Sequence, residues 1–534
     1  MKEFIKFIFV VLVPISLILI ITVEYNGDFD RDYYPSSKIE IQKKVIPVDH
    51  SKFEVLQKDF EKPQEITEAC LSCHNGRGEE FMKTEHWQWH KMDSVAGKGY
   101  EDLGKRNILN NFCIGVNANE KLCSLCHAGY GYGDKNFDFH NPNNIDCLVC
   151  HDKTGTYKKS KPGTGPNTGS GNPSPKVDLQ KVVQNIGLPQ RNNCGTCHYK
   201  GGGGNNVKHG DLEMALNKCT KDVDVHMAYD KKNMKCTDCH ETHNHNITGQ
   251  LYTVSSSNKN KVTCEKCHTA TPHKSKLLNN HYEQVACQTC HIPVYAKVNP
   301  TKIYWDWSTA GKMKDGKPYT EWSDDKLHEY DTKHGTAVFG KNLKPDYVWF
   351  NGMADHHLID EKIENTDGPL VLNKLSGSYK DYVKPADSLH RSKIWPVKIM
   401  KGKQIYDPVN KLLIQPKLVG PKGSGAYWAD FDWNASAKKG MDYIGLPYSG
   451  KYDFIETEGY WPLNHMVSTS DKALSCTECH SKNGRLKKPN DFYLPGRNYS
   501  SLIDTGGVIF MILVLLGVIV HGFMRIVSSK KTQH

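Results

Sequence analysis

The feature that most constrains this 534-residue chain is a five-residue pattern, C-x-x-C-H, that occurs eight times. Sixteen of the 18 cysteines belong to these motifs. In chain order they are Cys70 and Cys73, Cys123 and Cys126, Cys147 and Cys150, Cys194 and Cys197, Cys236 and Cys239, Cys264 and Cys267, Cys287 and Cys290, and Cys476 and Cys479. The histidines that follow them are His74, His127, His151, His198, His240, His268, His291 and His480. Whatever these motifs bind therefore determines how most of the chain folds.

C-x-x-C pairs also occur in zinc ribbons and in redox dithiols, but neither class requires a histidine directly after the second cysteine. C-x-x-C-H is the attachment motif of c-type haem, in which the thiols form thioethers with the porphyrin and the histidine binds the iron. With 26 histidines in the chain, chance places one after all eight pairs with a probability on the order of 10⁻¹⁰. The sequence predicts eight covalently attached haem c groups.

Apolar segments near both ends predict membrane anchoring. Residues 7–23 are apolar, follow two lysines and lack a small-residue cleavage pattern. We therefore interpret residues 1–24 as an uncleaved anchor, with a cleaved signal as the alternative. Residues 505–527 are long enough to span a bilayer, and two lysines follow them. Both termini are then cytoplasmic, and the rest lies on the periplasmic side of the inner membrane, where haem c is attached.

The spacing of the motifs divides the part outside the membrane. Residues 25–65 carry no motif and predict a polar spacer, whereas residues 66–291 hold seven motifs. Such a dense segment cannot build an ordinary side-chain core, so packed haems replace it. Residues 292–500 are rich in aromatic residues, and we expect them to cover the haems and carry the eighth motif. The expected fold is mainly α with extensive loops, a multihaem cytochrome c fold organised around packed haems, with one N-terminal and one C-terminal transmembrane helix.

The formal net charge of +10 would favour nucleic acid or anionic lipid as a partner. Each haem, however, adds two propionates to a ferric core of about +1, so eight oxidised haems contribute about −8. The basic residues are therefore expected to pair with propionates, and no nucleic-acid partner is predicted.

Electron-transfer haems usually take a second axial ligand, most often histidine. Of the 18 histidines outside the motifs, His50 in the spacer, His521 in the membrane segment and the terminal His534 are poor candidates. The predicted distal ligands are His86, His209, His226, His245, His273, His281 and His465, with His90 and His243 as close alternatives to His86 and His245. Seven distal histidines for eight haems leave one iron open to a substrate.

Several long strings in residues 66–497 resemble the octahaem tetrathionate reductase family of multihaem cytochromes. They include HWQW after the first motif, NFCI at 111–114, HAGYG at 127–131, DCLVCHDKTGTY at 146–157, GGGGNNVKHGDLE at 201–213 and WDWSTAGK at 305–312. The resemblance implies seven bis-histidine haems and one catalytic haem, which is the second along the chain.

In this family a lysine in a Gly-Thr-Tyr-x-Lys stretch binds the catalytic iron. Here Gly155-Thr156-Tyr157 is followed by two lysines, and the resemblance favours Lys159 over Lys158. Burial beside a ferric centre lowers the pKa of an amine enough for it to act as a ligand. Without the resemblance, these lysines would be interpreted as solvated. The sequence leaves open whether His127 also binds this iron.

The implied activities are reduction of tetrathionate to thiosulfate and of nitrite or hydroxylamine to ammonia. Proton donors are expected near the open iron face, and the candidates are Cys113, Asp152 and Tyr157. Cys113 and Cys219 are the two cysteines outside the motifs. The alternative to a catalytic role is that they are simply buried, or that a disulfide joins them. The expected partners are the small inorganic substrate, a quinol-oxidising or other redox protein, and the inner membrane. A pure electron conduit and hydroxylamine oxidation remain alternative functions.

Overall fold

The computed structural model describes residues 48–113, 115–161, 171–249, 260–387 and 390–531. The predicted N-terminal helix and most of the spacer lie outside these residues. The chain divides into two compact units. The main unit lies within residues 48–263 and 286–474, and the small unit lies within residues 264–285 and 475–531. Motifs six and eight are in the small unit, and the other six are in the main unit.

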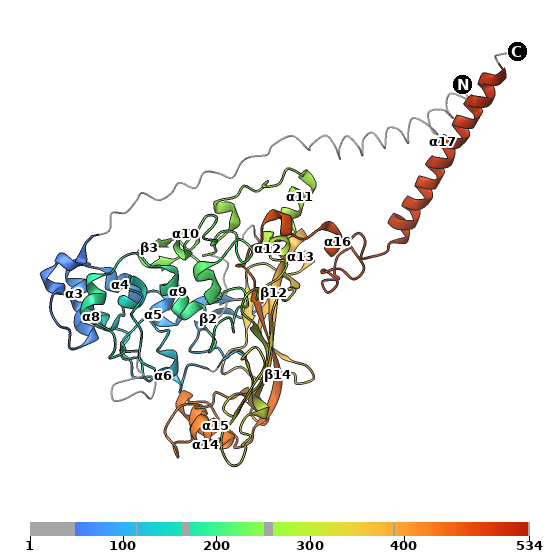
Figure 1. Cartoon of the computed structure of the whole chain (residues 1–534). Helices are drawn as coiled ribbons and strands as arrows, with labels where there is room; N and C mark the ends of the chain where they lie inside the picture. Colours follow the sequence, from blue (N-terminus) through green and yellow to red (C-terminus); the bar gives the residue numbers. More distant parts are fainter. Residues whose placement is uncertain (1–47, 114, 162–170, 250–259, 388–389, 532–534) are drawn as a thin grey trace. The chain divides into compact units, whose positions relative to one another are not determined.

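The first part of the main unit consists of short helices and loops, as predicted for a segment dense in haem motifs (Figure 1). The helices are α3 (Pro63–Cys73), α4 (Arg77–Met82), α5 (Glu85–Gln88), α6 (Glu120–Cys123), α7 (Leu148–His151), α8 (Leu179–Gln184), α9 (Arg191–His198), α10 (Cys236–Cys239) and α12 (Cys287–His291). The 3₁₀ turns are η2 (His50–Lys52), η3 (Glu54–Leu56), η4 (Pro142–Asn144) and η5 (Met214–Lys218). Two small hairpins accompany them, β1 (His90–Val95) with β2 (Gly99–Gly104) and β3 (Thr242–His243) with β4 (Asn246–Ile247). Most of these elements are too short to form alone, which agrees with folding around bound groups.

The later part of the main unit forms a ten-stranded sheet, which the expectation of a mainly α fold missed. The strand order is β10-β11-β14-β12-β5-β8-β7-β6, and β9 and β13 also pair with β12. Their bounds are β5 (Thr301–Asp306), β6 (Thr320–Trp322), β7 (His328–Asp331), β8 (Gly335–Gly340), β9 (Asp346–Phe350), β10 (Ala354–His356), β11 (Leu370–Leu375), β12 (Lys393–Asp407), β13 (Leu412–Leu413) and β14 (Asp453–Pro462). Aromatic and β-branched residues favour strands, so the aromatic composition of this region indicated sheet rather than only a cover.

The long strands β12 and β14 pair antiparallel, from Val397 opposite Pro462 to Tyr406 opposite Asp453, and they lie in the middle of the strand order (Figure 1). An aromatic core that includes Trp305, Trp307, Tyr427 and Trp433 packs beside them. It involves η8 (Trp307–Thr309), α14 (Tyr427–Asp430) and α15 (Trp433–Ile444). This part of the unit therefore has an ordinary side-chain core, unlike the motif-rich part. The remaining elements of the main unit are α13 (Tyr379–Val383) and η10 (Ser470–Lys472).

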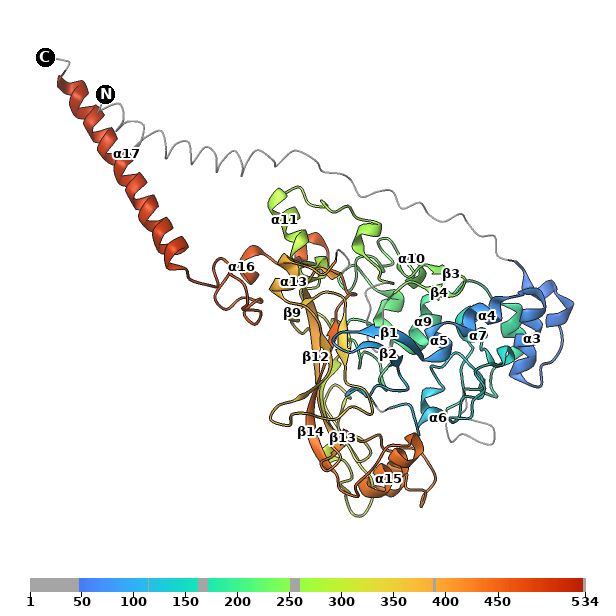
Figure 2. The ribbon, with the colours of Figure 1, turned by 180° about the vertical axis from the view of Figure 1, so that it is seen from behind.

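The small unit contains η6 (Cys264–Lys266), α11 (Lys276–Asn280), η7 (His281–Glu283), α16 (Cys476–Cys479), a π-helical turn η11 (Ser501–Thr505) and α17 (Gly506–Lys531). Residues Ser501–Ser528 form a helix long and apolar enough to cross a membrane, with a mean hydropathy of 2.6 and no buried part. The predicted C-terminal membrane segment therefore forms a helix. Figure 2 shows α16 close to the start of this helix.

Candidate haem sites and the second motif

Each motif lies on or beside a helical turn that places its two cysteines on one face. Residues three apart on a helix are neighbours, so both sulfurs of a C-x-x-C pair point the same way. The amide of the motif histidine donates to the carbonyl of the first cysteine, as in His74 to Cys70 at 2.9 Å and His480 to Cys476 at 2.8 Å. This local geometry fits two thioether bonds and an adjacent iron ligand.

Four motif histidines face a second histidine at one narrow range of distances. The ring centroids are 6.3 Å apart for His50 and His74, 6.0 Å for His86 and His198, 6.4 Å for His240 and His465, and 6.1 Å for His281 and His480. An imidazole nitrogen lies about 1.2 Å from its ring centroid and binds a first-row metal at about 2.0–2.1 Å, so two trans ligands place their centroids about 6.4 Å apart. The four pairs thus fit one iron each.

Ring orientation supports the same arrangement at three motifs. The Nδ1 atom of His151 hydrogen-bonds to the carbonyl of Gly187 at 2.9 Å, that of His240 to Thr248 at 2.7 Å, and that of His480 to Pro495 at 3.1 Å. A metal-binding histidine usually donates its other ring N–H to such an acceptor, which fixes the ring. The Nε2 atom of each ring is then directed to the iron.

His127 of the second motif has the opposite orientation. Its Nε2 atom hydrogen-bonds to the carbonyl of Trp87 at 2.7 Å, and its side chain is fully buried. Five aromatic rings enclose it at centroid distances of 4.5–5.8 Å, those of Trp87, Trp89, Tyr132, Phe137 and Phe139. We call these five rings the aromatic cage. The ring nitrogen that His151, His240 and His480 leave for an iron is therefore engaged with the main chain in His127.

Gly129 allows this close packing. A Cβ atom at position 129 would lie 2.8 Å from Cε1 of His127 and 2.9 Å from Cζ3 of Trp87, which is too close for any side chain. The carbonyl of Gly129 also accepts a hydrogen bond from Lys159 at 3.1 Å. One glycine thus lets the chain pass between the cage and the lysine.

Lys159 reaches the second motif from the loop after the third. Its ammonium also donates to the carbonyl oxygens of His127 and, at 3.4 Å, of Ser124, both on the segment of the second motif. The side chain is 3% exposed and lies 3.2 Å from the buried carboxylate of Asp146. Lys158 is exposed, and its carbonyl pairs with the amide of Ser174. Of the two lysines, Lys159 is therefore the one that lies beside the second motif.

Tyr157 and Asp152 position that lysine in different ways. The hydroxyl of Tyr157 donates to Asp146 at 2.8 Å, so tyrosine, aspartate and Lys159 form one buried chain of polar groups. Burial, followed by the charge of Asp146, raises the pKa of Tyr157 well above its ordinary value, so the phenol keeps its proton. Asp152 accepts from the amides of Thr154 at 2.7 Å and Tyr157 at 3.2 Å, so it fixes the loop rather than facing the motif.

The two cysteines outside the motifs lie in separate clusters and are not joined to each other. Cys113 packs against the aromatic core and lies within electrostatic range of Cys123 and Lys208. Cys219 is buried with Tyr199 and Leu216. Only Cys113 is therefore near the second motif, as predicted.

The remaining predicted ligands occupy different surroundings. His245, rather than the exposed His243, is close enough to His151 to act on it electrostatically. His90 hydrogen-bonds to Asp102 at 2.7 Å, whereas the ring of His86 faces that of His198. His226 and His273 stay predictions.

His209 and His50 both differ from what the sequence led us to expect of them as haem ligands. The ring of His209 contacts that of Trp461 at 5.6 Å, and no ring contact with a motif histidine is found for it within the described part of the chain. His50, which we had assigned to the spacer, instead faces His74. The signal that could have found it is the 3₁₀ turn starting at His50, capped by Asp49. Its place in the expected spacer argued against His50 and was misleading.

Basic side chains gather around the second motif. Lys105, Lys159 and Lys200 lie within electrostatic range of Cys126. The side-chain nitrogen of Lys208 lies over the rings of Phe112 and Trp461, at 5.4 and 4.8 Å, and burial lowers the pKa of this amine well below its usual value, so the positive charge comes from the other lysines. The resulting positive potential favours anions at this site.

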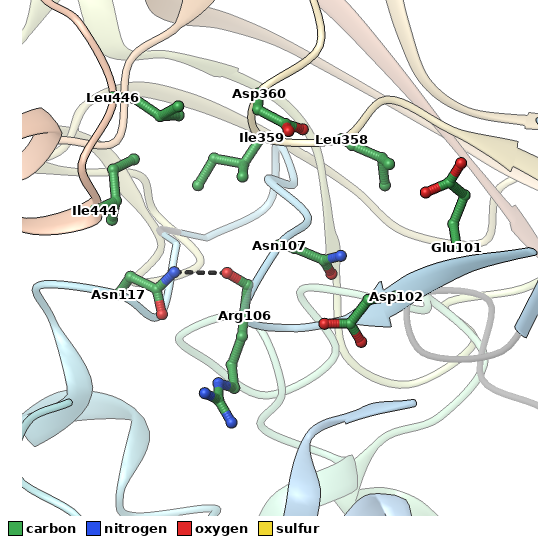
Figure 3. Close-up of a pocket in the computed structure, with 10 residues that line it drawn as sticks. All are labelled: Glu101, Asp102, Arg106, Asn107, Asn117, Leu358, Ile359, Asp360, Ile444 and Leu446. Carbon is green, nitrogen blue, oxygen red and sulfur yellow. Dashed lines mark hydrogen bonds between the residues drawn. The ribbon is translucent and has the colours of Figure 1, made fainter. Parts of the chain in front are cut away.

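A separate pocket of about 380 Å³ opens behind the cage. Figure 3 shows Glu101 and Asp102 on β2 and Asp360 on a loop, with the side chain of Arg106 extending away from Asp360. The guanidinium of Arg106 also lies 5.0 Å from the ring of Phe139, a cage residue. No motif residue lines this pocket, and we assign it no catalytic role.

Sulfur contacts connect motifs that are distant in sequence. Cys70 contacts Cys147, Cys126 contacts Cys197, and Cys194 contacts Cys236. The first motif thus adjoins the third, and the second and fifth both adjoin the fourth. Cys150 of the third motif also lies within electrostatic range of Cys194 of the fourth, so groups attached to these five motifs would lie in a connected series, as electron transfer requires.

Comparison with known proteins agrees with this arrangement. The family model described as "Cytochrome c bacterial" matches residues 302–483, and the model "Cytochrome c554 and c-prime" matches residues 69–152. An uncharacterised protein of Archaeoglobus fulgidus is 26% identical over 243 residues, which are 37% of this chain and 80% of that protein. The crystal structure of octahaem cytochrome c from Shewanella oneidensis is 41% identical, covers 82% of this chain and 95% of its own, and superposes with a TM-score of 0.74. Identity at this level over nearly the whole relative confirms the predicted haem c chemistry, and the chain belongs to the octahaem c-type cytochromes.

Proposed function

We propose that the chain binds eight haems and acts on the periplasmic side of the membrane as a multi-electron reductase of tetrathionate, nitrite or hydroxylamine. The second motif is its catalytic site. The observation that supports this proposal most concerns two residues at the second motif. The ring of His127 is held in the aromatic cage, and the ammonium of Lys159 lies beside the motif.

Cys123 and Cys126 would hold the second haem, and Lys159 would bind its iron from one side. Once bound, the haem supplies an iron that receives electrons from the other haems and passes them to a substrate. A lysine on one side, with His127 directed away, leaves the other side for the substrate. The paired histidines found at other motifs fill both sides and favour electron transfer alone.

The basic residues around Cys126 support an anionic substrate. Tetrathionate and nitrite carry two and one negative charges, and the potential of Lys105 and Lys200 would concentrate either anion at the site. Hydroxylamine is uncharged and gains nothing from these lysines. On this ground we expect the two anions to have the lower KM values.

Proton supply separates the two anions. Reduction of nitrite to ammonium takes up six electrons and eight protons, whereas cleavage of tetrathionate to two thiosulfates takes up two electrons and no protons. The buried chain from Tyr157 through Asp146 to Lys159 offers a route for protons to this motif. These residues would therefore serve nitrite reduction in particular.

The test is steady-state reduction of each substrate by the full-length holoprotein with reduced methyl viologen as donor. We expect turnover of tetrathionate and nitrite, and little of either in Lys159→Ala. Lys158→Ala is the matched control, because Lys158 is the exposed neighbour. Reduction of none of the three substrates would contradict the proposal and favour a pure electron conduit. Oxidation of hydroxylamine without reduction would contradict its direction.

A further inference from the structure

The small unit joins one histidine pair directly to the membrane helix. His281 lies between the sixth and seventh motifs in the sequence, yet its ring faces that of His480 of the eighth motif at 6.1 Å. Its Nδ1 atom hydrogen-bonds to the carbonyl of Leu277 at 2.8 Å, which leaves Nε2 for the iron. The eighth haem would therefore be held by α11, η7 and α16, all in the small unit.

The segment after the eighth motif folds back onto that motif. The Nδ1 atom of His480 hydrogen-bonds to the carbonyl of Pro495 at 3.1 Å. A Cβ atom at Gly496 would lie 2.4 Å from the carbonyl oxygen of His480, so only glycine permits this approach. Arg497 donates to the carbonyls of Leu486 at 2.7 Å and Phe492 at 2.5 Å, which closes the loop. The haem ligand and the loop are therefore one folded piece.

The membrane helix begins directly after this loop. The carboxylate of Asp504 accepts from the amide of Ser500 at 2.6 Å and from the hydroxyl of Tyr493 at 3.5 Å, which ties the first helical turn to the loop. Ser501, where the helix begins, is only six positions after Pro495, which orients His480. Six residues span at most about 20 Å even when fully extended, so the eighth haem cannot move far from the membrane.

Exposed apolar side chains surround this junction. Leu502 is 84% exposed, Tyr499 is 75% exposed, and Leu277 on the helix before His281 is 50% exposed. Tyrosine is enriched at the interface between membrane and water, where its ring and hydroxyl are both accommodated. The surface beside the eighth haem is thus suited to the bilayer interface rather than to water.

We propose that electrons enter the protein at the haem held by His281 and His480, from a quinol in the bilayer. A quinol loses two electrons and two protons to become a quinone. The two electrons would pass one at a time to the ferric iron of the eighth haem, and each would reduce Fe(III) to Fe(II). The first electron would move on to another haem before the second arrives. The two protons leave to the outer aqueous phase. This inference names the electron donor for the reductase proposed above, but it requires no particular substrate.

The first experiment lengthens the tether. Twelve Gly/Ser residues inserted between Asn498 and Tyr499 add about 20 Å of root-mean-square length and leave both axial ligands in place. Full-length holoprotein is placed in phosphatidylethanolamine–phosphatidylglycerol vesicles with a long-chain naphthoquinol, and haem reduction is followed by absorbance without any substrate. We expect the initial rate with quinol to fall more than tenfold, and the rate with reduced methyl viologen to stay within twofold.

The matched control carries the same insertion after Gly316, in the turn from Lys314 to Lys317 of the main unit. It should keep the quinol rate of the unaltered protein. An unchanged quinol rate in the tether variant, or equal losses in both variants, would overturn the inference. Because no substrate is present, failure of the reductase proposal would leave this result intact.

A second measurement identifies the entry haem by spectroscopy. His281→Met replaces one axial ligand and should shift one electron paramagnetic resonance (EPR) signal of the oxidised protein. In the unaltered protein mixed with quinol vesicles and freeze-quenched, that signal should disappear first. Earlier loss of any other signal would overturn the inference. If His281→Met does not assemble, the tether variant decides alone.

Discussion

The ammonium of Lys159 lies 3.2 Å from the carboxylate of Asp146, and the two side chains are 3% and 0% exposed. A buried pair of this kind is sensitive to loss of either member, because the remaining charge then lacks its partner, at a cost of about 3–5 kcal/mol. The pair ties the loop after the third motif to the segment of the second. The effect of a mutation at this pair on the stability of the fold therefore has to be separated from its effect on the reaction at the second motif.

Lys159→Ala should abolish most turnover. Loss of even an outer partner of a metal ligand costs about 10–100-fold in activity, so loss of the ligand itself should exceed about 100-fold in kcat/KM. The measurement is viologen-driven tetrathionate reduction, with haem content determined in the same preparation. Lys158→Ala should keep near-normal activity. Equal activity of both variants and the unaltered protein would refute the assignment.

Tyr157→Phe should separate the two anionic substrates. The variant loses the hydroxyl that donates to Asp146 at 2.8 Å but keeps the ring. General acid catalysis contributes about 10²–10⁴-fold, so nitrite reduction should fall by at least about tenfold, whereas tetrathionate cleavage needs no proton and should change little. Tyr304→Phe removes a comparable bond to Glu456 on the sheet and serves as control. Equal losses for both substrates in Tyr157→Phe would contradict the proton route.

His50→Ala should expose one iron. Removing a distal imidazole from a low-spin haem leaves a weaker ligand, so a new high-spin ferric EPR signal should appear. His209→Ala should give no such signal, because His209 contacts Trp461 rather than a motif histidine. The exposed His140 provides a control substitution. A high-spin signal in His209→Ala and none in His50→Ala would restore the assignment that the sequence suggested.

These histidines show what sequence reasoning can and cannot reach. The motifs determine where haem is attached because that chemistry depends on five consecutive residues. A distal ligand instead depends on which distant segment folds opposite the iron, as His465 does across 225 positions from His240. His50 was discounted because it lies in the spacer, although its ring faces that of His74.

The sheet was missed for a related reason. Its central strand β12 shows no strict alternation of buried and exposed residues, since Pro396 to Lys398 are buried in succession. A strand covered on both faces loses the period of two that identifies a half-buried strand. The second motif was singled out by family resemblance alone, because neither the cage around His127 nor the contact with Lys159 has a signature in sequence spacing.

The stability of the protein should fall at acid pH through His356 in β10. Burial lowers the pKa of this ring to about 3, whereas the unfolded chain protonates it near its usual value of about 6.5. Between these values the unfolded state binds more protons, so the free energy of unfolding falls as pH decreases, by about 1.4 kcal/mol per unit from this group.

Denaturant titrations at pH 7 and pH 5 test this expectation. His356→Gln should lose less stability than the unaltered protein between the two values, by about 2 kcal/mol, because glutamine takes up no proton. An identical loss in both proteins would show that His356 is not the group responsible.

The central claim is that one haem, on Cys123 and Cys126, has lysine in place of a second histidine. The EPR spectrum of the oxidised full-length protein tests it most directly. We predict seven low-spin signals of bis-histidine type and one distinct signal that Lys159→Ala removes and Lys158→Ala keeps. Eight bis-histidine signals, or a distinct signal unchanged in Lys159→Ala, would contradict the account.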